Sequence, residues 1–134
     1  DGGAFTKVTA YVPPDKASLE RVSAALPEGY RAIIGSVGAA GYVPFEILPT
    51  RLSKAVGIKA VCEHIGIPLS DTVAIGDSNN DVEAVACAAV GISIGGGCDD
   101  LVAVADIVAP GVSEDGLAWA LAAAGLIDEA PTPA

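Results

Sequence analysis

The chain has 134 residues, 51% of them apolar and only 4% aromatic, so we expect a packed core built from Ala, Val, Ile and Leu. Its 17 acidic and 7 basic residues give a net charge of −10, which argues against a nucleic-acid partner because such partners favour basic surfaces. No apolar run is long enough to span a bilayer, so no membrane partner is expected. Cys62, Cys87 and Cys98 are odd in number and lie in apolar or helical segments, which indicates buried thiols in a reducing cytoplasm.

The first third of the chain has the pattern strand, helix, strand, strand. Residues 5–12 (FTKVTAYV) are rich in β-branched and aromatic side chains, and residues 15–26 place apolar side chains on one helical face. Two further strands, 30–36 and 42–48, flank a glycine-containing turn and predict a hairpin. Because proline lacks an N–H, Pro44 predicts that the second of these strands lies at a sheet edge or a bulge.

From Thr50 onward, helices and strands alternate. Ser53 is a natural N-cap, and an apolar stripe with helical spacing follows it, made of Ile58, Val61, Cys62 and Ile65. The short apolar segment TVAI is typical of a strand in a parallel sheet. The later predicted elements are a helix over 79–88, a strand over 90–94, a short helix around 100–105, a strand over 106–109 and a final helix. This alternation predicts an α/β fold with a parallel sheet.

The stretch VAIGDSNNDVEA, residues 73–84, carries the most polar cluster of the chain at the point where a strand gives way to a helix. Ligands of open α/β sheets bind outside the carboxyl ends of the strands, which is where Asp77 falls. Carboxylate oxygens suit a hard cation such as Mg²⁺. Alternatively, Ser78 or Asn79 caps the helix and Asp81 complements its dipole. The capping interpretation explains Asp81 but leaves Asp77 unexplained.

A lysine and a glycine run are the other candidates for binding an anion. Lys54 falls at the first position of a predicted helix, where the helix dipole disfavours a cation, and a bound phosphate is one reason to keep a lysine there. Gly95, Gly96 and Gly97 lie between a strand and a helix, so their N–H groups could cradle an anion. They match no phosphate-binding motif, and a tight turn is the favoured interpretation.

Taken together, the segments LPTRLSKAVGIKAV, VAIGDSNNDVEAV, AVGISIG, ADIVAP and EDGLAWAL resemble the C-terminal part of haloacid dehalogenase-like (HAD) hydrolases of the Cof type. The resemblance implies the C-terminal half of a HAD-type, Rossmann-like core over residues 48–134. Residues 1–47 are then the closing portion of an α+β cap. A flexible tail is expected over 128–134.

The resemblance also implies chemistry, because these hydrolases are mostly Mg²⁺-dependent phosphatases that act through an aspartyl-phosphate. By this likeness Lys54, Asn80 and Asp81 are catalytic, with Lys54 steadying the phosphoryl oxygens. Asp77 and Asp81 are the metal ligands, and Asn80 and Asp81 support the metal shell and orient the lysine. The expected substrate is a small phosphorylated metabolite. Such chemistry depends mainly on positioning and on neutralising charge.

The chain departs from the family in one respect, because it contains no Asp-x-Asp nucleophile motif. We therefore expect it to be inactive alone, and to associate with itself or with an N-terminal fragment that completes the core. Two alternatives stay open, a phosphomutase of the same superfamily and a non-catalytic metal-binding or protein-interaction module. The expected location is the cytoplasm.

Overall fold

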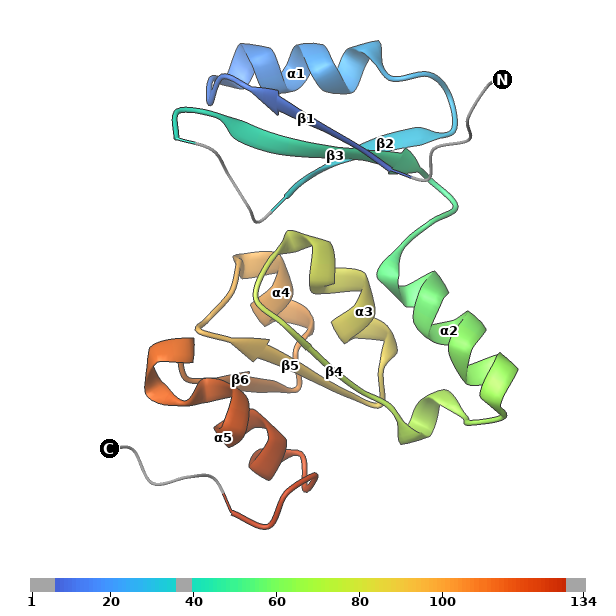
Figure 1. The fold of residues 1–134 in the computed structure, drawn as a ribbon, viewed down its shortest axis with the longest axis vertical. Coiled ribbons are helices and arrows are strands. Elements are labelled where there is room, and N and C mark those ends of the chain that lie inside the picture. Colours follow the sequence, from blue (N-terminus) through green and yellow to red (C-terminus); the bar gives the residue numbers. More distant parts are fainter. Residues whose placement is uncertain (1–6, 36–39, 130–134) are drawn as a thin grey trace. The chain divides into compact units, whose positions relative to one another are not determined.

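The computed structural model describes residues 7–35 and 40–129, and the chain forms two compact units, Asp1–Ser53 and Lys54–Ala134 (Figure 1). Each unit has its own sheet. The identification of residues 1–47 as part of a cap and of 48–134 as part of a hydrolase core remains a prediction, because compactness alone does not identify a cap.

The first unit is an antiparallel sheet with one helix. Its elements are β1 (Val8–Val12), α1 (Lys16–Ala25), β2 (Tyr30–Ile34) and β3 (Val43–Pro49). The strand order is β1-β3-β2, and both neighbouring pairs are antiparallel. Helix α1 begins after Asp15 because the Asp15 Oδ1 atom accepts a hydrogen bond from the Ser18 backbone N–H at 2.8 Å, which satisfies a free amide of the first turn.

The expectation drawn from Pro44 was wrong, because β3 is the central strand of this sheet rather than an edge strand. The ladder between β2 and β3 ends at the pair Ile34 and Phe45, so Pro44 lies just beyond it. The Pro44 carbonyl still accepts a hydrogen bond from Gly35 N–H at 2.9 Å. At the end of a ladder, a missing N–H costs little pairing. The predicted turn falls largely on residues 36–39, which lie outside the described residues, but the strands that flank it do pair.

The second unit confirms the predicted parallel sheet. Strands β4 (Val73–Gly76), β5 (Val90–Ile94) and β6 (Ile107–Ala109) are parallel in the order β4-β5-β6. The helices are α2 (Lys54–Ile65), α3 (Val82–Cys87), α4 (Asp99–Val104) and α5 (Gly116–Ala123), and the 3-10 turns are η1 (Leu69–Asp71), η2 (Asn79–Asp81) and η3 (Val112–Glu114). In the described part of the chain, none of the helices is long and apolar enough to cross a membrane.

Helices cover both faces of this parallel sheet, with α3 and α4 on one side and α5 on the other (Figure 1). Two small cores result. One contains Ala74, Ala84, Val85 and Leu101, and the other contains Ile92, Ile94, Ala109 and Ala120. Half of these side chains are alanine, and the loops at the carboxyl edge of the sheet follow directly from these cores.

The apolar stripe predicted on α2 is buried only in part. Cys62 is buried and Ile58 packs against the first core, whereas Val61 and Ile65 are 57% and 56% exposed. Helix α2 packs on α3. A groove of about 480 Å³ lies between α2 and the start of β4 and includes Val61 and Ile65 in its lining.

Candidate functional site

The candidate site lies at the carboxyl end of β4, in the loop that leads to α3. The single helix predicted over 79–88 is in fact the 3-10 turn η2 followed by α3. The carboxylate of Asp81 explains the difference. Its Oδ2 atom turns back and accepts hydrogen bonds from the backbone N–H groups of Asp77 and Ser78, at 3.2 and 3.3 Å. The chain therefore tightens around Asp81 before the regular helix begins.

Asp81 is a buried carboxylate, with 8% of its surface exposed. While Oδ2 faces backbone amides, Oδ1 forms an ion pair with the ammonium of Lys54. Burial by itself raises the pKa of Asp81, but the hydrogen bond from Lys54 and the amide of Asp77 outweigh burial and hold the pKa below its ordinary value. Asp81 is thus held in its ionised form.

Lys54 is the first residue of α2, as predicted, and 54% of its side chain is exposed. Its Nζ atom lies 3.5 Å from the Oδ1 atom of Asn80 in addition to its ion pair with Asp81. The structure therefore brings together three of the four predicted site residues, Lys54, Asn80 and Asp81, on the surface of the second unit. One carboxylate holds the ammonium in place, and the exposed part of the lysine can meet an anion from solvent.

Gly76 belongs to the polar stretch singled out in the sequence but was not among the predicted site residues. A Cβ atom at this position would lie 2.3 Å from Asp81 Cβ and 2.8 Å from Asp81 Cγ, far inside van der Waals contact. Only glycine lets the Asp81 side chain fold over the end of β4. The available signal was a glycine at the end of an apolar strand, which often marks a close approach of other atoms.

Asp77 is exposed, and its backbone rather than its carboxylate contacts Asp81. Among the described residues, no group of three or more His, Cys, Asp or Glu side chains is arranged to hold a metal ion. Mg²⁺ is commonly held by one or two carboxylates together with phosphate oxygens and water, and the exposed carboxylate of Asp77 fits one such position. The oxygens of Asp81 already face Lys54 and two amides, so its role as a metal ligand remains a prediction.

The glycine run after β5 forms the tight turn favoured above. Gly95, Gly96 and Gly97 all have positive φ, at 66°, 78° and 46°, and the Gly97 N–H donates to the Ile94 carbonyl at 3.2 Å. This backbone region is open to glycine and strained for other residues. The turn lies beside the Asp77 loop, because a Cβ on Gly97 would be 3.5 Å from the Asp77 carbonyl oxygen.

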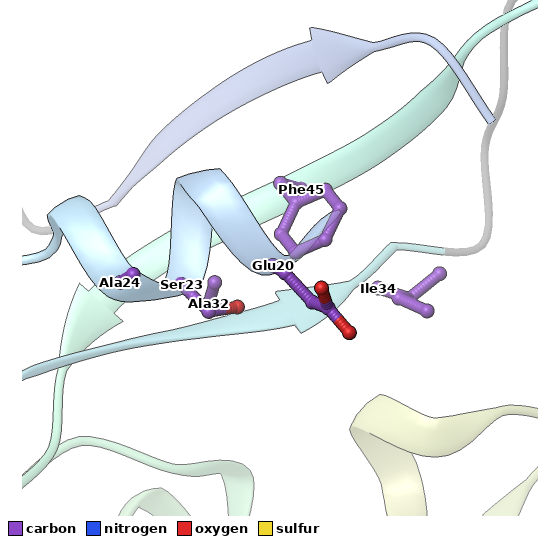
Figure 2. Close-up of a pocket in the computed structure, with 6 residues that line it drawn as sticks. All are labelled: Glu20, Ser23, Ala24, Ala32, Ile34 and Phe45. Carbon is purple, nitrogen blue, oxygen red and sulfur yellow. The ribbon is translucent and has the colours of Figure 1, made fainter. Parts of the chain in front are cut away.

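The first unit contains a separate groove of about 640 Å³ between α1 and the strands β2 and β3 (Figure 2). Its lining is mostly apolar and consists of Glu20, Ser23, Ala24, Ala32, Ile34 and Phe45. The charged group in this lining is the carboxylate of Glu20, and none of the lining residues is a cation, in contrast to the site around Lys54.

Comparison with known proteins identifies a family whose model matches most of the chain. The family model described as haloacid dehalogenase-like hydrolase matches residues 1–121. A solved structure of a subclass IIB sugar phosphatase of the HAD superfamily superposes with a TM-score of 0.75 at 26% identity, covering 90% of this chain and 44% of that one.

Curated relatives are similar over part of the chain. The protein YkrA of Bacillus subtilis is 38% identical over 82 residues, which is 61% of this chain and 32% of YkrA. A phosphoglycolate phosphatase of Methanopyrus kandleri is 28% identical over 113 residues, which is 84% of this chain and 47% of that protein. The chain thus spans about a third to a half of the length of these relatives.

Proposed function

Because the chain belongs to the haloacid dehalogenase-like hydrolases, we propose that it supplies the lysine and metal-binding part of a Mg²⁺-dependent phosphatase site for small phosphorylated metabolites. The observation that carries this proposal is the ion pair of Lys54 with the buried Asp81, next to Asn80 and at the carboxyl end of β4. The similarity to a sugar phosphatase and to a phosphoglycolate phosphatase supports a small phosphorylated substrate.

In this proposal Lys54 neutralises charge on the phosphoryl group. Phosphoryl oxygens carry negative charge throughout the transfer, and a cation fixed in advance stabilises them at no cost of reorganisation. Asp81 fixes this cation, because its carboxylate is itself held by the amides of Asp77 and Ser78.

The metal ion would be held in part by the carboxylate of Asp77, which is exposed directly after β4. When bound, Mg²⁺ would neutralise phosphoryl charge and orient the substrate. Asp81 is the second proposed protein ligand, and any further protein ligands are expected outside the described residues. This expectation agrees with the absence of an Asp-x-Asp motif from the 134 residues and with the share of its relatives that the chain spans.

The test is a pair of lysine and aspartate variants in the product of the complete open reading frame that encodes this chain. Lys54→Gln removes the charge and leaves a polar side chain that is one atom shorter, and Asp81→Asn keeps the shape and removes the fixed anion. We expect each to lower kcat for p-nitrophenyl phosphate by roughly 10²- to 10³-fold, as for the loss of one preorganised charge or donor. Lys59→Gln, on an exposed lysine of the same helix, is the matched control and should keep wild-type turnover. Wild-type turnover in Lys54→Gln would refute the proposal.

We also propose that these 134 residues alone do not hydrolyse phosphate esters and that they self-associate. The residue that would attack phosphorus is missing, and among the described strands β4 pairs only with β5. The open edge of β4 and the exposed Val61 and Ile65 beside it favour pairing with a second copy. Light scattering after size exclusion, with a p-nitrophenyl phosphate assay on the same fractions, tests both statements. An active 13.2 kDa monomer would contradict them.

A further inference from the structure

The hydroxyl of Ser78 lies between the two polar side chains that flank Lys54. Its Oγ atom is 2.8 Å from Asn80 Oδ1 and 3.2 Å from Asp81 Oδ2. A serine hydroxyl has one hydrogen, so it can make only one strong donation. Asp81 Oδ2 already accepts from two backbone amides. The hydroxyl of Ser78 therefore donates its hydrogen bond mainly to Asn80 Oδ1, which is the shorter of the two contacts.

The charge of Lys54 decides which end of the Asn80 amide faces it. An ammonium group only donates hydrogen bonds, so the atom of Asn80 that lies 3.5 Å from Lys54 Nζ must be the acceptor, Oδ1. Ser78 meets the same oxygen and therefore donates to it. With both donors on Oδ1, the NH₂ group of Asn80 is directed away from Lys54.

We propose that Ser78 is a positioning residue whose hydroxyl proton locks the Asn80 side chain with its Oδ1 atom toward Lys54. This deepens the proposed function and rests on it, since the fixed Oδ1 atom helps to hold the ammonium that would meet a phosphoryl oxygen. The lone pairs of the same hydroxyl remain available to cap η2, so one side chain serves both the local fold and the site.

The capping role and the locking role can be separated by substitution. At an N-cap, glycine costs only a few tenths of a kcal/mol relative to serine, whereas it has no hydroxyl to donate. Threonine keeps both the acceptor and the proton. Ser78 has an extended backbone, with φ −148° and ψ 172°, which threonine and glycine both adopt. Ser78→Gly should therefore release Asn80 with little loss of stability, and Ser78→Thr should retain the lock.

The small number of side-chain amides in the chain makes an NMR measurement of Asn80 simple. The sequence contains no Gln and two Asn, Asn79 and Asn80, so a ¹H–¹⁵N correlation spectrum of the chain shows two side-chain NH₂ pairs. Asn79 is exposed and serves as the internal reference. We expect the Asn80 pair to move to the position of a free amide in Ser78→Gly, to stay in Ser78→Thr and to stay in the control Ser70→Ala. Ser70 also has a hydroxyl next to a carboxylate, that of Asp71, at 3.1 Å.

An unchanged Asn80 pair in Ser78→Gly would overturn the proposal, and so would an equal displacement in Ser78→Thr. The spectra are recorded without substrate or metal. A lack of phosphatase activity in the complete gene product would thus refute the proposed function. The spectra alone decide whether Ser78 locks Asn80.

Discussion

Gly76→Ala is the substitution for which the structure gives the sharpest prediction. Gly76 is buried at the end of β4 and does not have positive φ, so its backbone suits alanine. The obstacle is steric, because the new methyl group would lie 2.3 Å from Asp81 Cβ, whereas carbon atoms prefer 3.5–4.0 Å. Asp81 Cβ is fixed to the backbone of η2, so the whole turn must move by more than about 1 Å.

The expected loss of stability has two parts. Overpacking of a tight site costs about 1–3 kcal/mol. Moving Asp81 also breaks or lengthens hydrogen bonds to its carboxylate, each worth about 1.5–3 kcal/mol when a charged group takes part. These contributions are not additive, since the same movement causes both. We expect a total loss of roughly 3 kcal/mol in the free energy of unfolding.

The assay is urea denaturation followed by far-ultraviolet circular dichroism, with Gly57→Ala as the matched control. Gly57 lies in α2, and a Cβ there would meet no atom within 4 Å. The same change of glycine to alanine should therefore stabilise the chain by about 0.5–1 kcal/mol through helix propensity. If Gly76→Ala unfolds at the wild-type urea concentration, the close approach of Asp81 to β4 is refuted.

Three further predictions concern charge. Asp77→Asn should abolish a weak heat of Mg²⁺ binding in calorimetry, and equal binding in the variant would remove Asp77 from the metal site. Lys54→Met should destabilise the chain, because it leaves the buried Asp81 without its cation, and unchanged melting would show that the ion pair contributes nothing. Since the pKa of Asp81 lies below the ordinary value of 3.8, its ionisation stabilises the fold above that pH, and this contribution is lost as the pH falls through the lowered pKa. The stability difference between wild type and Asp81→Asn should therefore shrink below pH 3.8, and a constant difference would contradict the assignment.

The sequence by itself determined the elements and the candidate residues. Alternating helix and strand patterns predicted the parallel sheet, and the polar cluster after β4 placed Asp77 and Asp81 at its carboxyl edge. These inferences succeeded because each depends on a local pattern: the periodicity of apolar side chains, or a cap at the start of a helix.

Tertiary structure decided what lies next to what. The ion pair joins Lys54 and Asp81, which are 27 positions apart in the sequence. It places the ammonium group at the start of α2 beside a buried carboxylate. Strand pairing in the first unit placed β3 at the centre of its sheet despite Pro44, and Val61 on α2 is exposed although it belongs to the apolar stripe. The residues beside Gly76 in the sequence do not show which other side chains pack against it. The need for glycine at this position became clear only from the Asp81 side chain that folds over it.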